Sequence, residues 1–214
     1  MLIDQLGRSS VAVVAGVGAV AILAVFWFNW DADVPTEAPD TSEISTLRLG
    51  MIDDERIRNA ARDEPGAWLT FGHGFEEQRF SDLAQINQDT VNELGIRWTK
   101  DLDTVHAVEA TPLVVDGVMY FTSTWNVAFA VDARNGDEIW RYDPEVPGKT
   151  GRDACCGIIS RGLAVYMGRV YLATLDGRLI ALDAVSGSLV WEVDTIIDRA
   201  RNYTITGAPR VRRR

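Results

Sequence analysis

Histidine and cysteine, which supply most transition-metal ligands in proteins, are scarce in this sequence. Among its 214 residues there are two of each. His73 and His106 stand far apart, and no third cysteine accompanies the adjacent pair Cys155 and Cys156, so no metal-ligand spacing is present. We therefore expect no zinc site in this chain.

Basic residues are outnumbered by acidic ones. The sequence has 21 Lys and Arg against 31 Asp and Glu, which gives a formal net charge of −10 at pH 7. A nucleic-acid-binding protein needs a basic surface to meet the phosphate backbone. No concentration of basic residues precedes Arg210, so the composition excludes nucleic acid as a partner.

Charge is missing altogether from Val11 to Trp30. A helix of that length, at about 1.5 Å per residue, would cross the roughly 30 Å hydrocarbon core of a bilayer. Arg8 lies before the run and Asp31 and Asp33 follow it, which places the N-terminus in the cytoplasm and the rest of the chain outside. We expect an anchor in a bacterial inner membrane with the domain in the periplasm. The alternative is a cleaved signal peptide, although its apolar core is normally about 7 to 15 residues long.

The composition divides the chain into three parts. Residues 1–30 are the membrane anchor or signal segment, and residues 31–50, rich in Asp, Glu, Pro, Thr and Ser, are a flexible acidic linker. Residues 51–214 are the folded part, in which Ile52–Ala61 carries the pattern of one short helix. From Ile96 onward, short β-branched and aromatic runs alternate with Asp-Gly and Asn-Gly turns, which indicates β-hairpins.

A repeat with a spacing of 51 residues runs through these hairpins. Its aligned pairs are Gly117–Tyr120 with Gly168–Tyr171, Ala130–Ala133 with Ala181–Ala184, Gly136 with Gly187, and Trp140 with Trp191. Such a unit predicts a β-propeller blade in which the Trp begins the last strand and packs between blades. Two blades cannot close a propeller, which needs about four to eight. We therefore expect the front of a longer protein, or a shortened gene product.

The cysteine pair allows two interpretations. Cys155 and Cys156 can bond only with each other within one chain, through a strained ring that would give a rigid, flat platform for a planar ligand. Arg161, five residues further on, would then supply a cation for a ligand carboxylate. The alternative is a pair of buried free thiols. Export favours the disulfide, because the periplasm is oxidising.

Several motifs carry a resemblance to a known family. They are EPGAWLTFG from Glu64, VEATPLVVDGVMY from Val108, ACCGIISRG from Ala154, TLDGRLIALDA from Thr174 and TITGAPR from Thr204. From Asp54 to about Arg210 the chain resembles the pyrroloquinoline quinone (PQQ) dependent alcohol dehydrogenases. The resemblance implies an all-β, eight-bladed propeller of the quinoprotein type with tryptophan-docking repeats. The first blades alone would be present, preceded by the N-terminal transmembrane helix.

The resemblance also assigns cofactor-binding residues. It implies a disulfide between Cys155 and Cys156 that stacks on one face of the quinone, and an ion pair between Arg161 and a PQQ carboxylate. Glu109 and Thr206 would hydrogen-bond to PQQ. Without the family, Glu109 would be an ordinary charge at a strand start and Arg161 a solvated surface residue.

One position departs from the family pattern. Ser160 stands before Arg161, where the relatives commonly have Asn, and it keeps a short polar side chain. We give this departure little weight.

The activity implied by the resemblance is oxidation of a small alcohol, with an aspartate as base, calcium or a lanthanide at the cofactor and a cytochrome c as electron acceptor. The aspartate and the metal ligands follow, in the family's chain order, after the position where this sequence stops. We therefore expect no catalytic or metal-binding residue in this chain, and no activity of the chain alone.

Two other functions fit a propeller. A non-enzymatic scaffold of the outer-membrane assembly type would share the tryptophan repeat, but it has no use for Cys155, Cys156 and Arg161 together, and as a lipoprotein it would need a cysteine after its signal segment. A membrane-bound quinoprotein glucose dehydrogenase would have several membrane helices, whereas this sequence predicts one.

Overall fold

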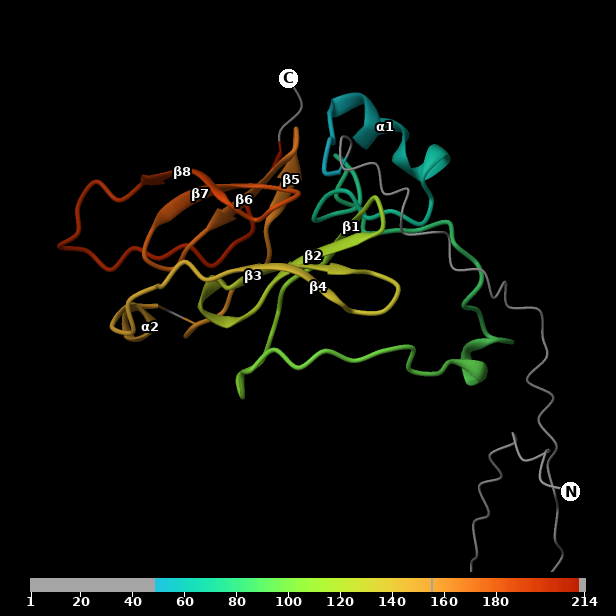
Figure 1. Cartoon of the computed structure of the whole chain (residues 1–214), viewed down its shortest axis with the longest axis horizontal. Helices are drawn as coiled ribbons and strands as arrows, with labels where there is room; N and C mark the ends of the chain where they lie inside the picture. The colour runs from blue at the N-terminus through green and yellow to red at the C-terminus, as the bar shows by residue number, and fades with distance from the viewer. Residues whose placement is uncertain (1–48, 155, 212–214) are drawn as a thin grey trace, which may run out of the picture. The chain divides into compact units, whose positions relative to one another are not determined.

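The computed structural model describes residues 49–154 and 156–211. Within these ranges the chain forms two four-stranded antiparallel sheets, each with its strands side by side in chain order (Figure 1). The first sheet comprises β1 (Leu113–Val115), β2 (Val118–Thr122), β3 (Ala128–Asp132) and β4 (Glu138–Tyr142). The second comprises β5 (Ala164–Tyr166), β6 (Arg169–Ala173), β7 (Arg178–Asp183) and β8 (Leu189–Asp194).

The predicted repeat corresponds to one sheet per unit. Ala130 pairs with Tyr120 on one side and Trp140 on the other, and Ala181 pairs with Tyr171 and Trp191 in the same way. The register also shifts at the same place in both sheets, directly after these alanines. One detail of the prediction is wrong: each Trp is the third residue of its strand rather than the first, because pairing extends two residues further back.

The predicted turns close hairpins in both sheets. Asp116 and Gly117 join β1 to β2 with φ of 52° and 77°, the left-handed pair that a tight two-residue hairpin requires. Gly177, with φ of 86°, lies in the turn between β6 and β7. A glycine supplies this conformation without the steric cost that other residues bear.

The predicted helix is confirmed with slightly shifted ends. Helix α1 (Asp54–Asp63) begins after Asp53, whose carboxylate accepts a hydrogen bond from the Arg56 main-chain N at 2.8 Å. The Arg56 guanidinium donates to Glu64 and Asp116, each at 2.6 Å, which ties the helix to the β1–β2 turn. The remaining helical segments are short, namely α2 (Thr150–Asp153) and the 3₁₀ turns η2 (Val91–Glu93) and η3 (Thr124–Asn126).

The two sheets share one hydrophobic core. A single cluster contains Leu113 and Tyr120 of the first sheet, Leu172 and Ile180 of the second, and Ile57 of α1. Burying these side chains removes apolar surface from water, at about 25 cal/mol per Å². The shared core therefore fixes the second sheet against the first.

Tryptophan and tyrosine side chains add hydrogen bonds across this core. Trp140 Nε1 and the Tyr120 hydroxyl both donate to Ala184 O at 3.1 Å. Burial, together with the carboxylates of Asp116 and Asp183, raises the pKa of the Tyr120 phenol well above its usual value, so this hydroxyl remains a donor. The main-chain oxygen of Ala184, directly after β7, therefore accepts hydrogen bonds from two side chains of the first sheet.

A second tryptophan makes the equivalent contact one sheet earlier. Trp98 Nε1 donates to Ala133 O at 3.1 Å, and its ring lies over Gly136, as the Trp140 ring lies over Gly187. Trp191, aligned with Trp140 in the repeat, is 41% exposed, whereas Trp140 is 7% exposed. Core packing was predicted for both and holds for Trp140 in the described part of the chain.

Two predictions fall outside the described residues. The membrane anchor or signal segment at 1–30 and the acidic linker at 31–50, except for its last two residues, cannot be compared with the structure. Across 49–154 and 156–211, the helices are all too short or too polar to traverse a bilayer.

Candidate cofactor site

Arg161 lies on the segment between α2 and β5, where its main chain is held on both sides. Its N donates to Thr206 O at 3.0 Å, and its O accepts from Thr111 N at 3.3 Å. The next residue, Gly162, has φ of +129°, and a Cβ there would approach Thr111 O to 3.3 Å. Glycine at position 162 therefore lets the chain pass close to Thr111. The main chain of Arg161 is held in place by hydrogen bonds on both sides.

Three of the predicted site residues meet at the Arg161 side chain. Its Nη1 donates to Thr206 Oγ1 at 2.7 Å, and its Nη2 lies 3.6 Å from Glu109 Oε2. The Arg161 side chain is 37% exposed and that of Glu109 is 44% exposed. Residues nearly one hundred positions apart in sequence thus form one half-open polar group, and their assignment to PQQ stays a prediction.

The neighbouring residue, Ser160, anchors this segment from beneath. Its side chain is buried, and its hydroxyl donates to Thr122 Oγ1 at 2.9 Å, at the end of β2. A buried hydroxyl pair is stabilising only while both partners are present. The departure from the family pattern at this position is therefore accommodated by a specific partner in the first sheet.

The cysteine pair is described in part. Cys156 is exposed and follows α2, so burial of this thiol, one of the two interpretations of the pair, is wrong. Cys155 lies outside the described residues, and the disulfide remains a prediction. Gly157, with φ of +73°, turns the chain directly after Cys156 toward Arg161.

The donors and acceptors of this group suit a planar acid that carries ring nitrogens. A guanidinium has five N–H donors in a plane and binds carboxylates in a fork. Within the described ranges, Arg161 directs its side-chain donors to Glu109 and Thr206, through Nη2 and Nη1, which leaves donors for a ligand. Glu109 can accept from a ring N–H, and the Thr206 hydroxyl can donate or accept. The residues present therefore fit the carboxylates and polar edge of PQQ.

Metal ligands cannot be assigned from this part of the protein. Among residues 49–154 and 156–211, no three His, Cys, Asp or Glu side chains gather closely enough to bind a metal ion. The calcium or lanthanide ligands were expected beyond the end of this chain, and that expectation stays a prediction.

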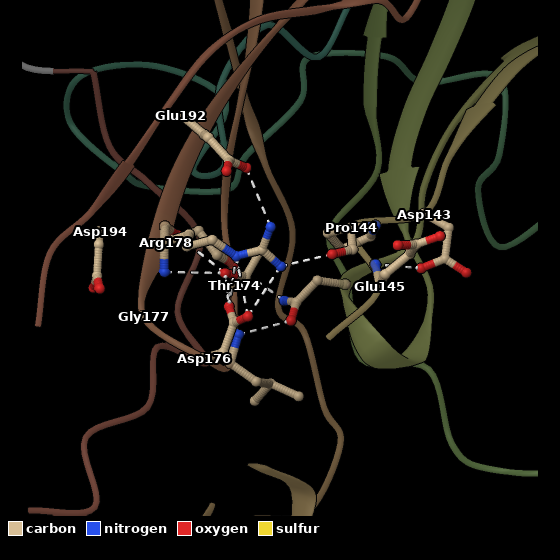
Figure 2. A network of polar contacts seen from close by, with 12 residues as sticks. Asp143, Pro144, Glu145, Thr174, Asp176, Gly177, Arg178, Glu192 and Asp194 are labelled. Carbon is tan, nitrogen blue, oxygen red and sulfur yellow. Dashed lines mark hydrogen bonds and ion pairs between the residues drawn. The ribbon is translucent and has the colours of Figure 1, made fainter. Parts of the chain in front are cut away.

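Two features of the structure had no clear signal in the sequence. Trp125 and Asn126, in η3, both have left-handed φ values, 59° and 61°, although neither is glycine. Arg178 at the start of β7 stands at the centre of a polar network that reaches Pro144, after β4 (Figure 2). Sequence periodicity indicates neither feature, because a left-handed backbone and a hydrogen bond between distant residues leave no repeating pattern in the sequence.

Comparison with known proteins identifies the family. The model of the "PQQ: Glucose/ethanol/alcohol dehydrogenase, beta-propeller domain" family matches residues 68–204. The 1-butanol dehydrogenase (cytochrome c) of Thauera butanivorans is 53% identical over 146 residues, which is 68% of this chain and 21% of that protein. The quinohemoprotein alcohol dehydrogenase ADH-IIG of Pseudomonas putida is 50% identical over 75% of this chain and 22% of its own length.

Solved structures give the same result. The structure of the Pseudomonas putida ADH-IIG enzyme superposes with a TM-score of 0.73 at 50% identity, covering 76% of this chain and 24% of that one. A europium-containing methanol dehydrogenase superposes with a TM-score of 0.69 at 33% identity, covering 74% and 28%.

The fold is thus that of the quinoprotein β-propellers, built from antiparallel sheets. The chain belongs to the PQQ-dependent alcohol dehydrogenase family. It spans about a fifth of the length of the curated relatives that it matches.

Proposed function

We propose that this chain is the N-terminal portion of a PQQ-dependent alcohol dehydrogenase and contributes one side of its cofactor site. The observation that carries this proposal is the meeting of Arg161, Glu109 and Thr206 around one guanidinium, within a domain of that family. Three separate segments converge there, and a structural ion pair would not need a threonine hydroxyl as well. The alcohol that the whole protein oxidises is not specified by these residues.

Each residue has a distinct part in holding the cofactor. Arg161 binds a carboxylate of PQQ, since its main chain is fixed and its guanidinium is half exposed. Thr206 orients the guanidinium and offers its hydroxyl to the ligand, and Glu109 accepts from the polar edge of the ring system. A disulfide between Cys155 and Cys156 forms a flat surface against one ring face. PQQ, when bound, supplies the two-electron oxidant for the alcohol.

The relatives and the sequence support proposals for the metal, the acceptor and the location. We propose calcium or a lanthanide for the complete site, because the family resemblance implies either metal and a solved relative of the same fold is a europium-containing methanol dehydrogenase. A cytochrome c is the proposed electron acceptor, because the Thauera butanivorans relative is named for one. The uncharged run Val11–Trp30 supports an inner-membrane anchor with the propeller in the periplasm.

We extend the sheet repeat to a full propeller of eight blades joined by docked tryptophans. The support is local: Trp98 and Trp140 each donate to the main-chain oxygen of an alanine three residues before the glycine that their ring covers. Trp191 would repeat this contact with a following sheet.

The cofactor proposal is tested by equilibrium titration of PQQ, on the protein encoded by the complete reading frame that contains these residues. Arg161→Ala removes a charge-assisted hydrogen bond worth about 1.5–3 kcal/mol, so the Kd should rise by about 10- to 150-fold. Arg161→Lys keeps the charge but loses the planar fork, and an intermediate effect is expected.

Arg169→Ala is the matched control. The Arg169 side chain is also half exposed, and its Nη1 lies 3.1 Å from Asp183 Oδ2. Its ion-pair partner is therefore neither Glu109 nor Thr206. Its removal should leave the Kd within about twofold, as for a surface ion pair. Equal Kd values for wild type and Arg161→Ala, or no PQQ binding by the wild type, would contradict the proposed function.

A further inference from the structure

The turn that joins β2 to β3 is held in an unfavourable conformation. Trp125 and Asn126 both lie in the left-handed region, which asparagine adopts readily but which costs a bulky residue such as tryptophan roughly 1–2 kcal/mol. Such conformations persist when surrounding contacts over-determine them, and they concentrate at functional sites. The contacts that hold this turn therefore indicate what it positions.

Asn126 fastens the turn to the second sheet. The side chain is fully buried, its Nδ2 donates to Ala173 O at 3.1 Å, and its Oδ1 accepts from Leu175 N at 2.8 Å. Ala173 is the last residue of β6, and Leu175 lies in the turn that follows it. Both polar atoms of the Asn126 side chain thus bond to the main chain at residues 173 and 175. Because this fixes the backbone of Asn126, it also constrains the backbone of the preceding residue, Trp125.

Trp125 in turn contacts both sides of the segment that carries Cys156. Its main-chain N donates to Ile158 O at 3.1 Å. A Cβ placed on Gly151, in α2, would lie 2.9 Å from Trp125 Cη2 and 2.9 Å from Ile158 Cγ2. The indole and the Ile158 side chain therefore both lie directly beside Gly151, and Cys156 lies on the stretch between Gly151 and Ile158.

The chain ahead of α2 is fixed by the network around Arg178. Figure 2 shows this guanidinium directed to Pro144, Asp176 and Glu192. Nη2 donates to Pro144 O at 2.6 Å, Nε to Asp176 Oδ2 at 3.0 Å, and Nη1 to Glu192 Oε2 at 3.1 Å. Contacts from the sheets thus hold the chain at Pro144 and again at Ile158, on either side of α2.

We infer that Trp125 is a positioning residue of the cofactor site, which holds Gly151 and Ile158, on either side of the cysteine pair, in place relative to Arg161. It acts through Ile158 and Gly151 and not by contact with Arg161, Glu109 or Thr206. The inference rests on the proposed function, because it assigns a role to Trp125 within the same PQQ site. Loss of the indole should loosen the surface beneath the quinone while leaving the guanidinium group in place.

The test compares two tryptophans by PQQ titration and by chemical denaturation, on the protein from the complete reading frame. Trp125 and Trp98 pack against the same small cluster of Phe121, Val127, Phe129 and Val131. Trp98, however, donates to Ala133 O, which follows the last residue of β3, whereas η3 precedes the first. Trp125→Ala should raise the Kd for PQQ at least tenfold, and Trp98→Ala less than threefold, although both lower the denaturation midpoint. Trp125→Phe, which keeps an aromatic ring, should recover part of the affinity.

A second variant tests the contact from its other side. Gly151→Ala adds one methyl group between Trp125 and Ile158, where there is no space for it, and it should raise the Kd by a similar factor. Combining it with Trp125→Phe, which removes the outer indole atoms, should raise the Kd less than the two separate effects multiplied.

Two results would overturn the inference alone: wild-type affinity in both Trp125→Ala and Gly151→Ala, or an equal loss of affinity in Trp98→Ala. Failure of the wild-type protein to bind PQQ would instead overturn the proposed function, and this inference with it.

Discussion

The hydroxyl of Ser160 anchors the segment that carries Arg161. It is buried and donates to Thr122 Oγ1 in the first sheet. The family resemblance assigned Arg161, Glu109 and Thr206 to PQQ from three separate motifs, and the structure brings their side chains together. The sequence could not reveal the partner of Ser160, because Thr122 lies 38 residues away in an ordinary strand.

Ser160→Ala tests the strength of this anchor. Removing the hydroxyl leaves Thr122 Oγ1 buried with one partner fewer, which should lower the free energy of unfolding by about 1–3 kcal/mol. The measurement is urea denaturation of the purified protein. Ser188→Ala, at an exposed hydroxyl pair with Ser186, serves as control and should change stability by less than about 0.5 kcal/mol. Equal losses in the two variants would show that the buried hydroxyl pair does not stabilise the segment.

Trp125 and Asn126 show where residue-level prediction ends. Left-handed backbone is expected mainly at glycine and asparagine, so the sequence gives no reason to expect it at Trp125, which stands between Thr124 and Asn126. Their conformation is determined by Ala173, Leu175 and Ile158, which lie on other elements. A single sequence contains no signal for such long-range contacts.

At the scale of elements, the hairpins were the most predictable part. Asp116-Gly117 has a turn chemistry that is nearly specific for a two-residue hairpin, and β1 and β2 pair around it as expected. The strand that holds Trp140 begins two residues earlier than predicted, at Glu138. The sequence did not show this start, because Glu138 and Ile139 are exposed and do not continue the alternation of apolar and polar residues. Pairing with β3 extends the strand where the pattern gives no indication.

The contact between Trp140 and Gly187 can be measured by adding a methyl group. In Gly187→Ala the new Cβ would lie 2.6 Å from the Trp140 ring, at a φ of +69°. Gly117→Ala is the control, since Gly117 has a similar φ of +77° and open space around it. Both variants place an alanine in the left-handed region, which costs about 1 kcal/mol. The difference between their free energies of unfolding therefore measures the cost of the contact with the Trp140 ring.

We expect Gly187→Ala to lose about 1–3 kcal/mol more stability than Gly117→Ala in urea denaturation, because the ring cannot shift without opening the core. Equal losses would mean that the ring moves freely and does not lock one sheet to the next. Gly136→Ala, beneath Trp98, should behave like Gly187→Ala, because its Cβ would also lie 2.6 Å from an indole.

At the scale of the molecule, the two aligned tryptophans differ in burial for a physical reason. Trp140 has Ala184 and Gly187 of the next sheet to pack against. For Trp191 the described part of the chain offers no following sheet, and all six residues of β8 are exposed. Sequence similarity predicts equal roles, whereas burial depends on what each sheet has beside it.

The central claim is that Arg161, Glu109 and Thr206 bind PQQ. The most direct measurement is a crystal structure of the protein from the complete reading frame, prepared with PQQ. The account predicts a PQQ carboxylate within hydrogen-bonding distance of the Arg161 guanidinium, and one ring face against Cys155 and Cys156. A quinone bound elsewhere, with Arg161 still paired only with Glu109 and Thr206, would contradict it.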